Sequence, residues 1–417
     1  MKFNKFNNDF VKSVTTLVTG TVLSQLFVFA LSPIISRIYT PDETANFSIY
    51  TRIVLFVSTL ATARFESALV LPKRNEHAFI LYRLIVQLVL ISFIISIILS
   101  FLIVFSGFNN SDESFIFLLI PFGFAPLCLM NVGNGWAMRQ GQFKEISKLR
   151  ILNSVSMNLS NVLFGWLGLG YKGLILAYIV GVSIPGAWFS RKYHLLKLKF
   201  KDFSERKRRK VIGTTYIDFP KVNLPHALMD IIRELLIVFF ILLFFNKNIL
   251  GSYDFSFKML KLPLTVIGGA IGQVYFQKIA AKRNNGESLY EITLITIRNL
   301  FFISIIPFSI LFMFGENIFC FVFGKDWALA GKYSEIMAPW LMLNLIVSPV
   351  SQLPVVIGKL KSFFWVGFTG SILLIGLLLV PYFVKISFED LLIYINYSQL
   401  IFLIFVLFWF LNLSKKY

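Results

Sequence analysis

Residues 250–283 read LGSYDFSFKMLKLPLTVIGGAIGQVYFQKIAAKR, an apolar run of helical length that carries cations inside it. Lys258 and Lys261 are one helical turn apart and therefore lie on one face of a helix. They fall roughly 8 to 11 residues into the run, which is about 12–16 Å deep, near the middle of a ~30 Å hydrocarbon layer. A lysine that faces lipid at that depth costs about 2.5–3.5 kcal/mol. The pattern therefore predicts a membrane helix whose lysines face protein, water or an anionic ligand.

The composition indicates a protein that crosses the bilayer many times. Of the 417 residues, 57% are hydrophobic and 15% are charged, and the mean hydropathy is +0.74. Repeated long apolar runs are typical of multi-pass membrane proteins, because a soluble domain has no use for so apolar a surface. The net charge of +19 is concentrated in loops between these runs. That distribution is typical of membrane topology and argues against a nucleic-acid partner.

Twelve apolar spans can be drawn along the chain. They cover approximately residues 12–36, 46–71, 80–106, 114–137, 150–169, 172–191, 222–245, 250–276, 293–314, 333–357, 362–383 and 390–412. A basic linker, residues 193–217, separates the sixth span from the seventh. We therefore expect an all-α membrane protein with two six-helix lobes related by an internal repeat, residues 1–192 and 218–417.

The lysines and arginines of the short loops are distributed unevenly between the two sides of the predicted bundle. When the N-terminus is placed inside, only a few basic residues fall outside: Arg37, Lys172, Lys247, Lys325, Lys332 and Lys385. The inside loops hold most of the others, including the dense group between residues 191 and 221. Because cytoplasmic loops carry an excess of Lys and Arg, we expect both termini in the cytoplasm.

A weak internal match relates the two halves. The second span begins with FSIYTR (47–52) and the eighth contains YDFSFK (253–258), each with an aromatic start and a terminal cation. If the lobes are equivalent, Arg52 and Lys258 face each other across the interface between them. Chance similarity between aromatic-rich helices is the alternative.

Acidic side chains accompany the cations inside the spans. Asp230, Arg233 and Glu234 are spaced i, i+3, i+4 and share one helical face. They either neutralise one another or couple transport to a proton or sodium gradient, because a carboxylate at that depth can change protonation. Asp254 can pair with Lys258, which leaves Lys261 without a partner in its own helix. This surplus of positive charge predicts a cationic cavity.

Another charged pair, Arg64 and Glu66, lies near the inner end of the second span. We expect the two side chains to pair locally or to extend toward the interface.

Four stretches resemble one known family. They are SPIISRIYTPDETANFSIY (32–50), ARFESALVLPK (63–73), LGLGYKGLILAYIVG (167–181) and YDFSFKMLKLPLTVIGGAIGQVYFQK (253–278). In this order they resemble bacterial polysaccharide-repeat flippases of the O-antigen, Wzx-like type. These belong to the multidrug/oligosaccharidyl-lipid/polysaccharide (MOP) superfamily, so the resemblance implies a MATE-like fold with two six-helix lobes around a central cavity. Arg52 is a departure, because many relatives are expected to have a small or polar residue there.

The resemblance implies a substrate, a sugar repeat unit on undecaprenyl pyrophosphate, and movement from the cytoplasmic to the outer leaflet by alternating access. We expect residence in the bacterial cytoplasmic (inner) membrane, contact with membrane lipids and with polysaccharide polymerase machinery, and no cofactor. The candidate substrate ligands are Arg52, Arg233, Lys258 and Lys261. The candidate ion-coupling carboxylates are Asp230, Glu234 and Asp254.

Two other functions are possible. A MATE-like drug or cation antiporter would have an acidic and aromatic cavity, whereas the surplus charge inside the spans here is basic. A membrane glycan polymerase or ligase usually needs a large external loop with catalytic carboxylates or arginines. The longest outside segment, about residues 315–332, holds only Glu316 and Asp326 as acids, and the scattered cysteines and histidines give no metal spacing. We therefore expect a transporter and not an enzyme.

Overall fold

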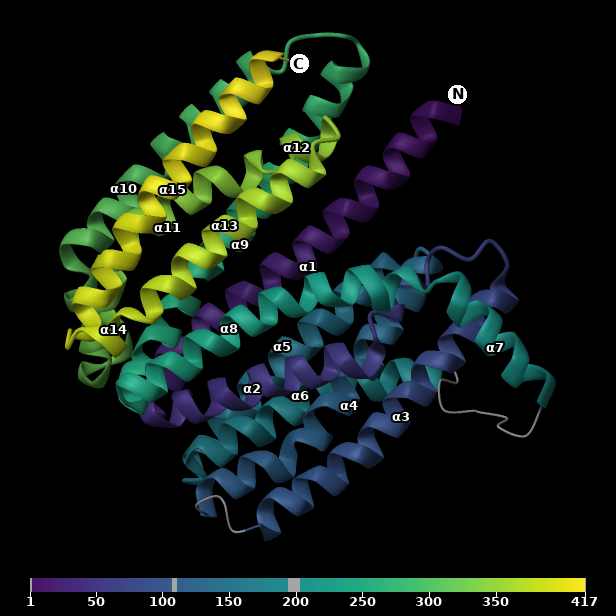
Figure 1. Ribbon diagram of the computed structural model, residues 1–417, viewed down its shortest axis with the longest axis horizontal. Helices are drawn as coiled ribbons and strands as arrows, with labels where there is room; N and C mark the ends of the chain where they lie inside the picture. Colours follow the sequence, from purple (N-terminus) through teal and green to yellow (C-terminus); the bar gives the residue numbers. More distant parts are fainter. Residues whose placement is uncertain (1, 107–110, 194–202, 417) are drawn as a thin grey trace. The chain divides into compact units, whose positions relative to one another are not determined.

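The computed structural model describes the backbone of residues 2–106, 111–193 and 203–416, which is helical with no strand (Figure 1). The long helices are α1 (Lys2–Ile38), α2 (Pro41–Thr62), α3 (Asn75–Phe105), α4 (Ser111–Arg139), α5 (Phe143–Trp166), α6 (Gly170–Lys192), α8 (Leu224–Phe244), α9 (Lys247–Asn284), α10 (Tyr290–Phe323), α11 (Ala328–Val350), α13 (Leu360–Leu378) and α15 (Phe388–Lys416). The short elements are η1 (Phe65–Ala68), α7 (Phe203–Thr215), the π-helix η2 (Phe219–Asn223), η3 (Lys325–Trp327), α12 (Leu353–Val356) and α14 (Val380–Phe383).

The twelve long helices coincide with the twelve spans expected from the sequence, so the predicted all-α fold is confirmed. Within the described residues, nine helices are long and apolar enough to cross a membrane. The other three long helices are α2, α5 and α8. Helix α8 falls short because its 21 residues carry three charged side chains, whereas α2 and α5 are rich in Ser, Thr and Asn. Polar helices of this kind are stable in a bilayer only where other protein surrounds them.

The basic linker contains a helix that the sequence did not lead us to expect. Helix α7 forms within the segment expected to be a hydrophilic connector, and it lies against α3. Ile212 of α7 is buried, and a Cβ on Gly213 would lie 3.3 Å from Leu84 Cδ2. The first half of α7 is a run of mostly basic residues, and only a few apolar positions can face α3. The periodicity of apolar residues is therefore too weak to predict a helix from the sequence. Part of the linker, residues 194–202, lies outside the described residues.

The chain divides into two compact units. Unit 1 consists of Met1–Leu31 and Asn46–Leu235, and unit 2 consists of Ser32–Ala45 and Leu236–Tyr417. The unit boundaries fall inside α1, α2 and α8. The two lobes expected on either side of the linker at 193–217 stay a prediction.

Unit 1 is built around α4 and α6, with α3 and α5 packed on them. Its core residues include Tyr50, whose Oη donates a hydrogen bond to Leu119 O at 3.0 Å. A Cβ on Gly123 would lie 2.1 Å from that same Oη, and a Cβ on Gly133 would lie 2.3 Å from the Phe189 ring. Glycine is therefore needed at both positions of α4, because large aromatic side chains fill the space beside it.

Unit 2 is built around α11, which packs against α9, α10 and α15. The indole of Trp327 is fully buried and donates to Ser36 O at 2.7 Å, while Ser36 Oγ donates to Phe323 O at 3.0 Å. The ring of Phe255 lies 3.9 Å from that of Trp327. These bonds explain why the end of α1 belongs to unit 2 and not to unit 1.

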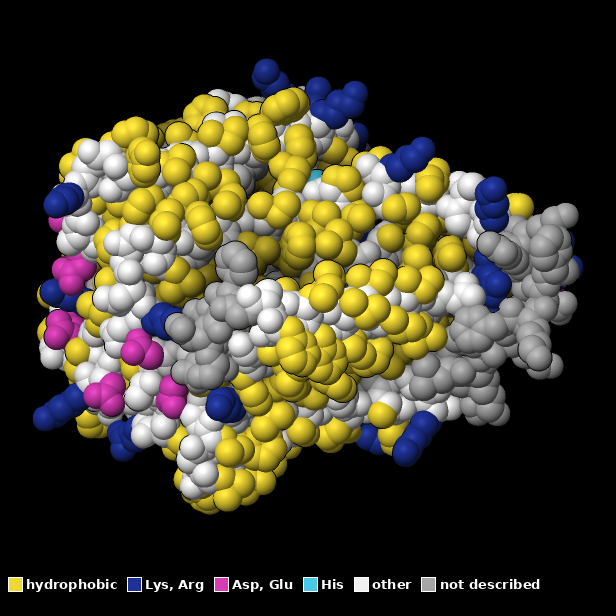
Figure 2. Space-filling model, turned by 60° about the horizontal axis from the view of Figure 1, so that its bottom comes forward, with side chains coloured by type: hydrophobic (Ala, Val, Ile, Leu, Met, Phe, Trp, Pro, Cys, Tyr) yellow, Lys and Arg dark blue, Asp and Glu magenta, His cyan; other side chains and the backbone are white. Residues whose placement is uncertain are grey.

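Large apolar side chains are exposed on the long helices, as contact with lipid requires. Leu102 and Phe105 of α3 and Phe302 and Ile306 of α10 are examples. Figure 2 shows hydrophobic side chains over most of the described surface in view, with most charged side chains near its margins. Such a surface would aggregate in water and is stable in a bilayer.

Candidate substrate and coupling residues

Helix α9 carries a polar stripe along one face. Asp254, Lys258, Lys261 and Thr265 follow one another at i, i+4, i+7 and i+11, which places all four on the same side of the helix. The two lysines and Thr265 are exposed, and Asp254 is half-buried. Because α9 is long and apolar enough to span a membrane, this stripe is costly against lipid and favourable against water or a polar ligand.

The rest of α9 explains why the lysines project outward. The helix begins after Asn246, whose Oδ1 accepts a hydrogen bond from Ile249 N at 2.9 Å. Its apolar face, which includes Phe255, Met259 and Leu264, is buried in unit 2. Burial of these residues turns the opposite face, with its lysines, away from the core.

Neither lysine of the stripe forms a salt bridge with a described residue. The Lys261 ammonium lies 5.3 Å from the centroid of the Phe257 ring, a cation–π contact within the same helix. On the N-terminal side of Lys258, the nearest charged residue of the helix is Asp254, one turn away. The stripe therefore has two lysines without a salt bridge to a described acid, and the cationic cavity expected from the sequence stays a prediction.

Arg52 lies on α2 in unit 1 and is half-buried. Its guanidinium donates a hydrogen bond to Ser48 Oγ, one turn earlier on the same helix. This bond holds the long side chain along α2, so its charge has a defined position in unit 1. The predicted equivalence of Arg52 and Lys258 remains a prediction, because the two residues belong to different units.

The charged triplet of α8 forms an ion pair. Arg233 Nη2 lies 3.6 Å from Asp230 Oδ1, so these two members partly neutralise each other, as one alternative predicted. Asp230 is exposed, and Glu234 is half-buried. All three lie in unit 1, with Arg52, while Asp254, Lys258 and Lys261 lie in unit 2.

The turn after α2 confirms the expected local pairing of Arg64 and Glu66. Arg64 Nη1 lies 3.3 Å from Glu66 Oε1, and Arg64 Nε donates to Asn223 Oδ1 of η2 at 3.0 Å. Ala63 and Arg64 have φ of 47° and 60°, a left-handed conformation that side chains rarely adopt. This strained turn lets the chain reverse between α2 and α3. Sequence reasoning missed the strain because neither residue is Gly or Asn.

Metal coordination has no support in the described part of the chain. No group of three or more His, Cys, Asp or Glu side chains there could hold a metal ion.

Sequence reasoning also missed a cavity between the α2–α3 turn and the end of α4, because its walls come from segments far apart in the sequence.

Comparison with known proteins places these features in a family. A family model described as "Polysaccharide biosynthesis protein" matches residues 34–331, more than half of the chain. No curated protein matches the sequence. Among solved structures, the lipid II flippase MurJ in an inward closed conformation is similar with a TM-score of 0.69, 14% identity, and coverage of 97% of this chain and 89% of that chain.

Multidrug transporters have the same architecture. The MATE multidrug transporter DinF-BH, solved as a complex, gives a TM-score of 0.64 and 17% identity, covering 95% of this chain and 93% of that chain. An inward-facing MATE family transporter of the MOP superfamily gives a TM-score of 0.61 and 14% identity, covering 96% of this chain and 95% of that chain. The chain therefore belongs to the polysaccharide biosynthesis protein family and has the membrane-helix fold of the MATE transporters and the lipid II flippase MurJ.

Proposed function

We propose that this protein is a flippase that moves an undecaprenyl-pyrophosphate-linked oligosaccharide repeat unit from the inner to the outer leaflet by alternating access. The observation that carries the proposal is the α9 stripe, where Lys258 and Lys261 are exposed and make no salt bridge with a described residue. Membership of the polysaccharide biosynthesis family supports a glycan as cargo.

The physical problem is the polar part of the substrate. A pyrophosphate and a row of sugar hydroxyls lose their hydration in hydrocarbon, which costs several kcal/mol or more for each ion. A wet, cationic chamber lowers this barrier, while the polyprenyl chain stays in the lipid. Lys258 and Lys261 would supply mobile point charges, and Arg52 and Arg233 would supply guanidinium groups that bind two oxygens at once.

Coupling to an ion gradient is assigned to the carboxylates in the same helices. Asp230, Glu234 and Asp254 lie close in sequence to the cationic candidates, so a change in their protonation or sodium binding would change the charge of the chamber. The Asp230–Arg233 pair supports this role, because an ion pair at 3.6 Å with accessible partners can open and close at little cost. The protein would act in the bacterial cytoplasmic membrane, with both termini inside and with polysaccharide polymerase machinery receiving the product.

A cation exporter is the competing function on this fold, and its cargo carries the opposite charge. The accessible charge of the α9 stripe is positive, which disfavours a cationic drug and favours a phosphorylated lipid.

Substrate selection in proteoliposomes tests the proposal. The purified protein is reconstituted with a fluorescent undecaprenyl-pyrophosphate oligosaccharide, and transfer between leaflets is followed with a membrane-impermeant quencher. We expect transfer well above that in empty liposomes, and no efflux of a cationic dye such as ethidium from the same preparation. Dye efflux without movement of the glycolipid would make the protein a drug exporter and refute the flippase assignment.

A further inference from the structure

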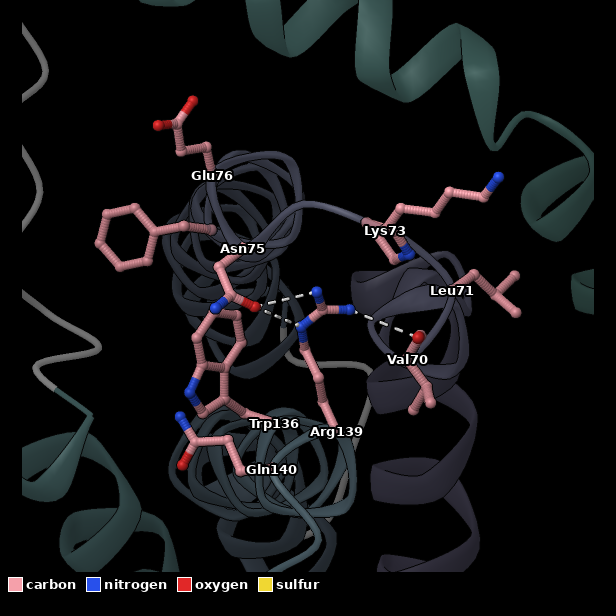
Figure 3. Close-up of a pocket in the computed structure, with 10 residues that line it drawn as sticks. Val70, Leu71, Lys73, Asn75, Glu76, Trp136, Arg139 and Gln140 are labelled. Carbon is pink, nitrogen blue, oxygen red and sulfur yellow. Dashed lines mark hydrogen bonds between the residues drawn. The ribbon is translucent and has the colours of Figure 1, made fainter.

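A cavity of about 850 Å³ opens in unit 1 where the α2–α3 turn meets the end of α4. In Figure 3 the Arg139 guanidinium lies at the centre of this cavity, with Lys73 and Leu71 to one side and Trp136 to the other. The walls are thus part cationic and part apolar. None of the candidate transport residues lines it.

The charge of Arg139 is fixed in place by neutral groups. Its Nε and Nη2 both donate to Asn75 Oδ1, at 3.3 and 3.0 Å, and its Nη1 donates to Leu69 O at 3.2 Å and Val70 O at 3.3 Å. An amide and two peptide carbonyls orient the guanidinium without cancelling its charge. These bonds occupy most of the five N–H donors of the guanidinium, so Arg139 offers an anion its fixed positive charge and the remaining Nη2 N–H.

Lys73 adds a second, mobile cation to the same cavity. Its side chain is exposed, and it forms no salt bridge with any residue that the structure describes. The acid in the lining, Glu76, points away from the Arg139 guanidinium in Figure 3. The Lys73 ammonium also extends away from the guanidinium in Figure 3, so Arg139 supplies the fixed charge of the cavity and Lys73 a mobile charge at its edge.

The apolar wall indicates where the cavity sits in the membrane. Val70 and Leu71 are 44% and 57% exposed although they belong to a turn between two long helices. Both α3 and α4 are long and apolar enough to span a membrane, and the turn lies at their ends, so we expect it near the lipid headgroups. Trp136 in the same wall is a residue type enriched at that depth. An occupant must therefore offer an anion beside an apolar surface.

We propose that this cavity binds an anionic glycerophospholipid, with its phosphate held between Arg139 and Lys73 and its acyl chains against Val70 and Leu71. A membrane lipid fits because its phosphate and acyl chains match a cationic wall beside an apolar one. The site would hold this lipid whether or not the protein transports a glycan. The polyprenyl pyrophosphate of the proposed substrate has related chemistry and is the rival occupant in the test.

Thermal unfolding of the purified full-length protein in detergent tests the assignment. Short-chain phosphatidylglycerol is titrated, with phosphatidylcholine of the same chain length as the neutral comparison. We expect phosphatidylglycerol to raise the apparent Tm, because a ligand that binds only the folded state stabilises it. Lys73→Gln should weaken the apparent affinity for phosphatidylglycerol about five-fold, the effect of losing one charge near a membrane surface.

Lys221→Gln is the matched control, because Lys221 is also an exposed lysine of unit 1 and does not line the cavity. It should keep the wild-type response, and both variants should have the wild-type Tm without lipid. Equal stabilisation by the two lipids, or equal loss of affinity in the two variants, would overturn the proposal. Native mass spectrometry supplies a second arm. Displacement of phosphatidylglycerol by undecaprenyl pyrophosphate in wild type but not in Lys73→Gln would assign the cavity to the transport substrate instead.

Discussion

Gly251 illustrates how one residue sets the distance between two backbone segments of unit 2. A Cβ at this position would lie 1.8 Å from Pro41 O, a backbone atom at the start of α2 that no side-chain rotation can move away. The backbone of α9 at Gly251 therefore packs directly against the backbone at the start of α2. Both partners lie in or beside stretches that resemble the flippase family, but the contact itself joins residues far apart in the sequence.

Gly251→Ala should lower the free energy of unfolding by about 1–3 kcal/mol, the usual effect of forcing an extra methyl group into a packed site. The measurement is the thermal unfolding midpoint in detergent. Gly269→Ala on the same helix is the control, because nothing lies within 4 Å of a Cβ there. It should be neutral or slightly stabilising, since alanine favours the helix. Equal midpoints for the two variants would show that the close approach of α9 to Pro41 is not rigid.

The residues of the candidate site were predictable to different degrees. The spacing of Lys258 and Lys261 follows from their positions within one apolar run, and their shared helical face is as expected, whereas their depth in a membrane and their place in a cavity stay predictions. The fixed guanidinium of Arg139 was not predictable, because its acceptors come from a turn about seventy residues away in the sequence. Local spacing reports on one helix, whereas such a contact depends on how helices pack.

At the scale of the element, the long helices were predictable because apolar runs of sufficient length have few other structures available to them. The short elements were not predictable from the sequence. Helix α7 and the π-helix η2 lie in polar sequence, and their formation depends on packing against α3 and on the turn at Arg64. The strained turn after α2 was likewise invisible, because tertiary contacts offset its cost.

The segment η3 anchors the end of α1 through one indole. Trp327→Phe keeps an aromatic ring beside Phe255 and removes the N–H that donates to Ser36 O. The buried carbonyl then loses this donor, so we expect a loss of about 1–3 kcal/mol in the free energy of unfolding. Trp166→Phe, at a position that is 75% exposed, should leave the unfolding midpoint unchanged. If the two substitutions lowered the unfolding midpoint equally, the Trp327 hydrogen bond would not anchor the end of α1.

Asp230 of helix α8 is one of the carboxylates proposed to couple flipping to an ion gradient. Asp230→Asn removes the carboxylate that pairs with Arg233 and leaves the rest of the helix intact. We expect the midpoint of the pH profile of flipping, or its sodium dependence, to shift by about one unit of pH or tenfold in concentration. Asp218→Asn, at an exposed acid just before η2, is the control. If both variants retain the wild-type profile, the charges of α8 serve packing alone.

At the scale of the whole molecule, the fold class and the family were predictable from the sequence, whereas the two lobes divided at the basic linker stay a prediction. The predicted lobes were separated at the basic linker, because polar connectors usually mark a boundary. In the structure the boundaries lie within continuous helices, for example between Leu31 and Ser32 and between Leu235 and Leu236. Hydropathy does not record such a boundary, because the chain remains helical on both sides of it.

We propose that the positive charges of Lys258 and Lys261 on α9 hold the pyrophosphate as it crosses the membrane. The most direct measurement is the rate of glycolipid flipping in proteoliposomes containing equal amounts of wild type, Lys258→Gln, Lys258→Arg and Lys278→Gln. Lys278 is an exposed lysine of the same helix outside the stripe. Loss of one charge-assisted contact corresponds to about 1.5–3 kcal/mol, so Lys258→Gln should slow flipping by about ten-fold or more. Lys258→Arg and Lys278→Gln should stay within about three-fold of wild type. Wild-type rates for correctly folded Lys258→Gln would contradict the claim.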